Sequence, residues 1–468
     1  MKKIFGIILF MVSFGIYAQN TETVIIFHTN DMHGNLKNFP VAKYIIDSVK
    51  TIYGETVFVF SAGDIFTGNP VVDKFIPDTV KKKTNKYFGY PIIDIMNKIG
   101  YDVSEIGNHE FDYTIPVFIE REKQAEFSFI CANIKPNDTG VKLHPYKMFK
   151  TKAGNKIFVL GLLQIGKNGY PDAYIPKVKA LTFLNPNEVI SQYSGVRDTV
   201  NLFILLSHLG SDTDMVVASR TDIFDLIIGG HTHKLIDTVI NNTLVVQAYK
   251  KMRYLGMITV EIKDGKVVRK KEKFFNLREY GSYDNELKKL VDKYENAEFL
   301  NEVVAVAKET LYELDRLGKL ITNAMLDYTK ADIAFQNNGG IRLREIPKGD
   351  ITLRTVYSLS PFGNKYVLLK MNVNQIVDLI KYAYSLHNEN ELQAGGISFE
   401  LVKDKNGALK SVTLYKEGKP IKKGTFTVAI NDYMYSAYEI KYEEKIKIFE
   451  KPDAEVIISY LKKQKVIQ

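Results

Sequence analysis

The sequence predicts an α/β layered domain followed by a second domain that mixes helices with hairpins. A chain of 468 residues is longer than a domain with a single hydrophobic core usually is, so two domains are expected. From about residue 23 to 277, short continuous apolar runs alternate with helical stretches, and such runs are typical of strands buried on both faces. Residues 282–296 then show the spacing of an amphipathic helix, which we interpret as the connection between the domains.

Six apolar runs predict the buried strands of the first domain: residues 24–27, 57–60, 157–160, 202–206, 226–228 and 244–246. Pro91 and Gly100 bracket a predicted helix over 91–98, because proline favours the first turn of a helix and glycine its end. Asp264-Gly265 predicts a hairpin, and Asn372 is placed to cap a helix in the second domain. We expect a first domain over 22–275, a linker helix within 276–300 and a second domain over 301–468.

Composition excludes several classes of protein. A charged fraction of 25% with 45% hydrophobic residues is typical of a folded chain and excludes global disorder. Cys131 is the single cysteine, which excludes a disulfide framework, a thiolate zinc site and an iron–sulfur cluster. The net charge of +9 is spread along the chain, so no nucleic-acid binding is expected, while a mild positive excess suits small anionic substrates. The sequence leaves the oligomeric state open.

The first residues have the pattern of an export signal. Lys2 and Lys3 precede an apolar stretch over residues 4–16, which is shorter than the about 20 residues of a membrane span. We predict a signal peptide over 1–19 and a periplasmic or secreted protein, with no stable membrane insertion after cleavage near Ala18 or Gln19. An uncleaved anchor is the alternative, because the cleavage site lacks the usual small residue.

Rare polar residues follow the apolar runs. Because the carboxyl ends of strands in an α/β sheet border one crevice, we expect these side chains to converge. In each of the pairs Asp31/His33 and His231/His233, the two side chains point the same way if the backbone is extended. Imidazole and carboxylate ligands without thiolate suit two divalent ions of zinc, manganese, iron or cobalt, with Asp64 as the natural bridge. The predicted ligands are Asp31, His33, Asp64, Asn108, His208, His231 and His233. Any one of these motifs alone would more often be a turn or a solvated loop.

The same residues carry a family resemblance. The motifs are Thr-Asn-Asp-Met-His-Gly-Asn at 29–35, Gly-Asp at 63–64, Gly-Asn-His-Glu-Phe-Asp at 107–112, Ser-His at 207–208 and Gly-His-Thr-His at 230–233. They resemble the calcineurin-like metallophosphoesterases and, more narrowly, the 5′-nucleotidase / UDP-sugar hydrolase family. Asn-Asn-Gly-Gly-Ile-Arg at 337–342 and Ser-Pro-Phe-Gly-Asn at 360–364 extend the resemblance into the second domain.

The resemblance implies a four-layer α/β sandwich with an α+β substrate-specificity domain. It assigns Asp31, His33, Asp64 and His233 to one metal, and Asp64, Asn108, His208 and His231 to the other. His109 and Asp112 correspond to the catalytic pair of the family. The implied substrate-binding residues are Asn338, Gly340, Arg342, Phe362 and Asn364, with Phe362 stacking on the base. For Phe362 a role as a core residue is the alternative.

Two features depart from the family pattern. Asn431-Asp432-Tyr433 is not followed by the usual Gly-Gly-Asp-Gly-aromatic run, which supplies the second face of the base clamp, and Tyr435 or Tyr438 is a candidate replacement. Leu311 lies near the place of a common arginine. The sequence thus predicts an exported two-metal phosphohydrolase acting on nucleoside 5′-monophosphates or related phosphoesters. The alternatives are a cyclic-nucleotide phosphodiesterase, a UDP-sugar pyrophosphatase and a non-catalytic protein that binds phosphorylated ligands.

Overall fold

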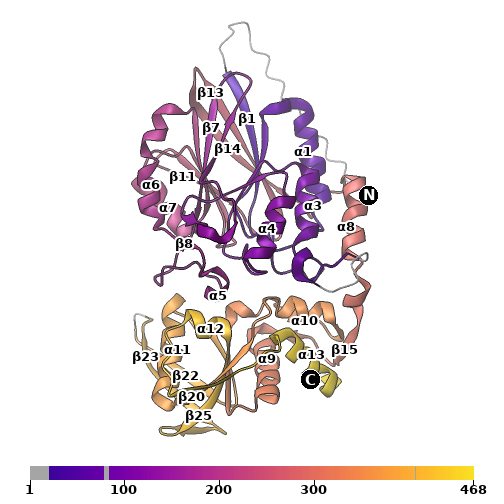
Figure 1. The fold of residues 1–468 in the computed structure, drawn as a ribbon, viewed down its shortest axis with the longest axis vertical. Helices are drawn as coiled ribbons and strands as arrows, with labels where there is room; N and C mark the ends of the chain where they lie inside the picture. The colour runs from indigo at the N-terminus through magenta and orange to yellow at the C-terminus, as the bar shows by residue number, and fades with distance from the viewer. Residues whose placement is uncertain (1–20, 78–83, 406) are drawn as a thin grey trace.

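The computed structural model describes residues 21–77, 84–405 and 407–468. The predicted signal peptide over residues 1–19 lies outside the described residues. Among the residues described, no helix is long and apolar enough to cross a membrane. The chain forms two bodies stacked along the long axis of the molecule, with the N-terminal body above the C-terminal one in Figure 1.

Two six-stranded sheets pack face to face at the centre of the first body. Their apolar side chains meet between the sheets, among them Ile26, Phe60, Val159 and Ile204. The first sheet contains, in spatial order, β14 (Lys266–Asn276), β13 (Tyr254–Lys263), β1 (Thr21–Thr29), β2 (Val57–Ser61), β3 (Val103–Glu105) and β4 (Ser128–Ile130). The second contains β11 (Leu235–Ile240), β12 (Thr243–Ala248), β10 (Leu226–Gly229), β9 (Leu202–His208), β7 (Lys156–Leu163) and β6 (Tyr146–Lys150).

Helices cover the outer face of each sheet and complete four layers. On the first sheet lie α1 (Phe39–Tyr53), α3 (Tyr90–Ile99), α4 (Ile115–Gln124) and α8 (Asn285–Glu295). On the second lie α6 (Pro186–Gln192) and α7 (Ser211–Arg220). The predicted sandwich and its six buried strands are therefore confirmed. The predicted helix over 91–98 is α3, and Gly100 ends it with φ 78°, a conformation that glycine adopts without steric cost.

The topology brings the ends of five strands to one region. β1, β2 and β3 are parallel neighbours in the first sheet, and β9 and β10 are parallel neighbours in the second. Asp31, Asp64 and Asn108 follow β1, β2 and β3, whereas His208 ends β9 and His231 follows β10. Each predicted metal ligand thus lies at or just beyond a strand's carboxyl end, or two residues after a ligand that does.

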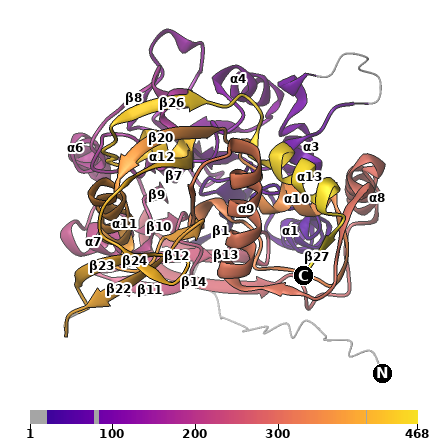
Figure 2. The ribbon, with the colours of Figure 1, turned by 90° about the horizontal axis from the view of Figure 1, so that it is seen from below.

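The second body is built on a mixed five-stranded sheet. In spatial order its strands are β21 (Leu392–Gly395), β17 (Ile333–Asn337), β25 (Thr425–Asn431), β20 (Tyr366–Asn372) and β26 (Glu444–Ile448). One face packs on α9 (Glu313–Thr329), α10 (Leu353–Leu359) and α13 (Asp453–Gln464). The other packs on α11 (Val373–His387) and the strands β22 (Ser398–Lys403), β23 (Leu409–Lys416) and β24 (Lys419–Ile421). Figure 2 shows these two groups on opposite sides of the sheet. The smaller sheet of β15 (Val303–Ala307), β19 (Gly349–Thr352) and β27 (Val466–Ile467) joins the chain ends of this body.

Several contacts join the bodies. The predicted linker helix is α8, and its Leu287 and Val291 pack in the core of the first body. Beyond it, Arg354 Nη2 donates to the carbonyl oxygen of Glu295 at 2.9 Å. α5 (Ile175–Val178) lies against α12 (Asp432–Ala437), and Figure 1 shows the two helices close together. In a further contact between the bodies, the Lys74 ammonium lies 5.2 Å from the ring centre of Tyr357.

Candidate metal centre and substrate cavity

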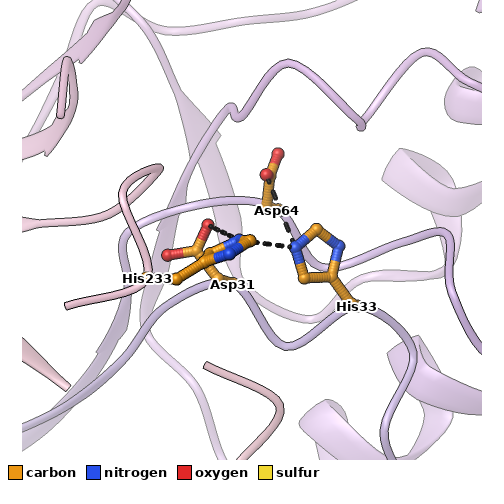
Figure 3. Close-up of side chains that lie close together, drawn as sticks. All are labelled: Asp31, His33, Asp64 and His233. Atoms are coloured by element: carbon orange, nitrogen blue, oxygen red, sulfur yellow. Dashed lines mark hydrogen bonds and ion pairs between the residues drawn. The ribbon is translucent and has the colours of Figure 1, made fainter. Parts of the chain in front are cut away.

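One group of predicted ligands lies beyond β1 and β2. Asp31, His33, Asp64 and His233 each offer a ligand atom, and these atoms lie within 4.8 Å of one another, converging as Figure 3 shows. His233 Nε2 is 3.0 Å from His33 Nε2 and 3.4 Å from Asp31 Oδ1. His33 Nε2 is 3.9 Å from Asp64 Oδ2. Two carboxylates and two imidazoles at this spacing suit one divalent transition metal.

A second group shares Asp64 with the first. Asp64 Oδ2 lies 3.3 Å from His208 Nε2. Asn108 Oδ1 lies 3.3 Å from the same nitrogen and 3.0 Å from His231 Nδ1. The carboxylate of Asp64 therefore stands between the two groups, which is the place of a ligand that serves two ions.

Most of these residues have an unusual backbone conformation. The dihedral angle φ is 49° at Asp31, 47° at His33, 55° at Asp64, 74° at His231 and 57° at His233. Residues other than glycine rarely adopt positive φ, and each case costs on the order of 1 kcal/mol. Strain of this kind gathers at functional sites, so its presence at five of the seven predicted ligands supports a functional role independently of the sequence motifs.

Hydrogen bonds behind the ligands orient them. His33 Nδ1 is 3.1 Å from the carbonyl oxygen of Thr67, and His208 Nδ1 is 2.7 Å from that of Ala62. An Nδ1–H that donates to a carbonyl leaves the Nε2 lone pair facing the cluster, as metal-binding histidines require. Gly107 is needed for space, because a Cβ there would lie 2.2 Å from Asp64 Oδ1.

The electrostatics of the site demand positive charge beside Asp64. Burial lowers the pKa of His33 well below its ordinary value, so this ring is neutral and able to bind a metal. Burial also opposes a charge on His208, but Asp64 outweighs it and raises the pKa of His208 to about 10. The donor set and its charge fit divalent metal ions.

His109 and Asp112 form a close pair next to these groups. His109 Nδ1 lies 2.7 Å from Asp112 Oδ2. Burial opposes the charged imidazolium, but the carboxylates of Asp112 and Asp64 outweigh it and raise the pKa of His109 above its ordinary value. The pair is therefore suited to hold a proton at Nε2 close to the metal centre.

A cavity of about 230 Å³ opens from the metal centre toward the second body. Gly340, Arg342, Phe362 and Asn364 line it together with His109. The ring of Phe362 stacks on that of His109, with centroids 5.5 Å apart at an interplanar angle of 14°. The guanidinium of Arg342 lies 5.4 Å from the centre of the Phe362 ring. Phe362 thus faces the site rather than the core.

The structure differs from the sequence-based expectation at two places in this cavity. Asn337 lines it, whereas Asn338 points elsewhere: its Nδ2 donates to Asn390 O at 2.7 Å and its Oδ1 accepts from Gln393 at 2.9 Å. Among the residues described, Tyr433 is the tyrosine after Asn431 that lines the cavity. Tyr435 is instead 3.1 Å from Tyr442, hydroxyl to hydroxyl, and Tyr438 packs on Tyr382 with ring centres 5.4 Å apart.

Sequence reasoning also missed four residues around the start of α5. Asp172, Ala173 and Tyr174 line the cavity from the irregular segment that leads into α5, and Lys177 lines it from α5 itself. Asn108 Nδ2 donates to the carbonyl oxygen of Asp172 at 2.9 Å, so this segment is tied to the metal centre. The segment contains no periodicity or recognisable motif, and only its place in the fold reveals its role.

Comparison with known families defines the class of the protein. The family described as calcineurin-like phosphoesterase matches residues 25–235, and the 5′-nucleotidase C-terminal domain matches residues 297–439. The first covers the sandwich and the metal centre, and the second covers most of the body that completes the cavity. The protein is therefore a metal-dependent phosphoesterase. More narrowly, the chain belongs to the 5′-nucleotidase family, as the resemblance of its motifs implies.

Individual relatives agree with this assignment. The chain is 28% identical to a 5′-nucleotidase of Vibrio cholerae over 446 residues, which cover 78% of this chain and 76% of the relative. It is 26% identical to the protein UshA of Escherichia coli over 480 residues, covering 86% and 84%. The structure of a 5′-nucleotidase precursor from Thermus thermophilus has a TM-score of 0.77 at 24% identity, covering 95% of this chain and 97% of that one. The sulfate thiohydrolase SoxB of the same organism has a TM-score of 0.74 at 15% identity, so the fold alone does not fix the substrate.

Proposed function

We propose that this protein is a two-metal phosphohydrolase that releases phosphate from nucleoside 5′-monophosphates or related phosphoesters. The observation that carries the proposal is the position of Asp64 between two groups of ligands, at the inner end of a cavity that also contains Phe362 and Tyr433. A phosphate at the metal centre would leave the rest of a nucleotide in reach of both aromatic rings.

The residues of the chain have separate parts in the reaction. The two groups of ligands that share Asp64 would hold divalent ions, which would supply Lewis acidity and activate water for attack on phosphorus. His109, held by Asp112, donates from Nε2 to a phosphoryl oxygen and stabilises the charge that develops there. Arg342 adds a permanent positive charge at the same cavity. Metal identity is not fixed by this donor set, which suits zinc, manganese, iron or cobalt.

The aromatic pair gives the substrate its orientation. Phe362 comes from the loop after α10, and Tyr433 comes from α12, so two separate segments bring rings to one cavity. Stacking a base on one aromatic ring is worth about 1–3 kcal/mol. Tyr433 replaces the clamp face that the missing glycine-rich run supplies in the family.

A substrate panel separates this function from its alternatives. Purified protein with added manganese is assayed by chromatographic separation of substrate from products on 5′-monophosphates, a 2′,3′-cyclic nucleotide, UDP-glucose and 4-nitrophenyl phosphate. The proposal expects the highest kcat/KM on a 5′-monophosphate. A faster reaction on the cyclic nucleotide or on UDP-glucose would favour the phosphodiesterase or pyrophosphatase reading. Tight nucleotide binding with no turnover of any substrate would favour a non-catalytic binding protein.

We also propose export, which rests on the pattern of residues 1–19. N-terminal sequencing of protein recovered from outside the cytoplasm tests this: a start close to Gln19 is expected, and a retained Met1 would contradict it.

From the sequence pattern we also propose that the boundary between the two domains lies within residues 275–301. Limited proteolysis should cut within this range before it cuts either body, and a first cut inside a body would contradict it.

A further inference from the structure

A second cavity lies on the other side of Arg342 and His233. It has a volume of about 690 Å³, and these two residues line both cavities. Lys250 Nζ lies 3.2 Å from Nδ1 of His233, whose Nε2 faces the first metal group. The second cavity therefore begins one imidazole ring away from the predicted metal centre.

The lining of this cavity carries more cationic than anionic side chains. Lys250, Lys251, Arg342 and Arg344 line it, against the two carboxylates of Glu313 and Glu345. Among the described residues, none of the four cations forms an ion pair with a carboxylate. Burial and repulsion from Arg342 and Lys250 lower the pKa of Lys251 to about 8. Cations kept close together without a partner lower the free energy of a bound anion.

The two lysines are held in place at a conformational cost. In the loop between β12 and β13, φ is 65° at Tyr249, 53° at Lys251 and 53° at Met252, a region that favours glycine. Hydrogen bonds fix this loop to the metal-binding loop: Lys251 N donates to Asp31 O at 2.8 Å, and Asn30 Nδ2 donates to Tyr249 O at 2.5 Å. Backbone strain that neighbouring bonds maintain beside a reaction centre indicates a functional position.

We infer that the cavity lined by Lys251 and Arg344 is a second anion subsite, which binds a phosphoryl group beside the metal centre. This inference rests on the proposed function, because it takes the first phosphate to lie at the metals. The phosphoryl group has two possible sources: a second phosphate of the substrate, or the inorganic phosphate that hydrolysis releases. Tetrahedral oxyanions with two charges match several converging N–H donors, as lysine and arginine provide here.

The test uses two double variants of the manganese-loaded protein, Lys251→Gln/Arg344→Gln and Lys251→Gly/Arg344→Gln. Glycine suits the positive φ at position 251, so the second variant keeps the loop without strain. The matched control is Arg269→Gln/Lys288→Gln, which removes the same charge from exposed ion pairs outside both cavities. Thermal melting of each variant checks its folding.

Two kinetic measurements distinguish the two possible sources of the bound phosphoryl group. If the subsite holds a substrate phosphate, KM for a nucleoside 5′-diphosphate rises at least tenfold in the variants, and KM for the 5′-monophosphate changes less than threefold. If it holds the released phosphate, the inhibition constant of inorganic phosphate rises at least tenfold whichever substrate is used. Each figure corresponds to the loss of about one charge-assisted contact. Variants that behave like the control in both measurements would overturn the inference.

Direct binding separates this inference from the proposed function. Calorimetric titration of the loaded protein with pyrophosphate needs no turnover. Weaker binding by the variants than by the control supports the subsite even if the substrate panel shows no hydrolysis. Equal binding by all of these proteins would reject the subsite and leave the proposed function standing.

Discussion

Replacing Phe362 with alanine tests how the second body contributes to substrate binding. The ring of Phe362 lies 5.5 Å from that of His109, centroid to centroid, and borders the cavity that Tyr433 also lines. Loss of one stacking face costs about 1–3 kcal/mol, and near the lower end of that range about 1.4 kcal/mol corresponds to a tenfold change. We expect Phe362→Ala to raise KM for a nucleoside 5′-monophosphate by roughly tenfold.

The choice of control substrate follows from the same geometry. Because Phe362 lies against His109, an aryl phosphate at the metal centre would also reach its ring, so glycerol 2-phosphate is the better reference. Its KM should change less than twofold. Tyr435→Ala is the matched control variant, since the Tyr435 hydroxyl is hydrogen-bonded to that of Tyr442 and Tyr435 does not line the cavity. Equal losses on both substrates, or equal losses in both variants, would refute the assignment of Phe362 as a base-stacking residue. Tyr433→Ala combined with Phe362→Ala should give non-additive losses if the rings share one base.

Three further substitutions test other parts of the account. His109→Ala should lower turnover by roughly 10²–10⁴ with metal content unchanged, and metal loss in this variant would show that His109 is a ligand instead. Asp64→Asn should do the most harm to metal binding, because both groups of ligands share this carboxylate, and metal analysis showing two ions retained would contradict the bridge. Asp453→Asn tests a pH effect: burial raises the pKa of Asp453 from 3.8 to about 7, although Ser360 donates to it at 2.8 Å. The folded protein therefore holds this proton between about pH 4 and 7 where the unfolded chain has lost it, so stability falls as pH rises through this window. The variant should flatten that decline by up to about 1.4 kcal/mol per pH unit, measured by denaturant unfolding, and a slope equal to that of the exposed control Asp292→Asn would contradict the assignment.

Sequence reasoning predicted the cluster of candidate metal ligands because these residues have a simple relation to the fold. Asp31, Asp64 and His231 follow buried apolar strands, and parallel strands bring their carboxyl ends together. Short continuous apolar runs likewise predicted the α/β layered domain, because they suit strands buried on both faces, whereas the four-layer sandwich was implied by the family resemblance. What the spacing does not reveal is the positive φ at five ligands, which tertiary hydrogen bonds impose.

The substrate side was harder to predict for a physical reason. Asn337 and Asn338 are adjacent, and the local chain direction alone decides which of them faces the cavity. Tyr433, Asp172 and Lys177 enter it from segments without periodicity, so only tertiary packing brings them there. The loop between β12 and β13, which contains Lys251, has no sequence motif either. Its relation to the metal centre becomes visible only through the hydrogen bond of Lys251 to Asp31.

The central claim is that seven side chains from the strand ends hold two metal ions around Asp64. Metal analysis of the purified protein, after chelation and reconstitution with manganese or zinc, tests it most directly. About two ions per chain are expected for a two-metal phosphohydrolase. A saturated content of one ion or fewer per chain, in protein that is folded by its thermal melt, would contradict the shared role of Asp64.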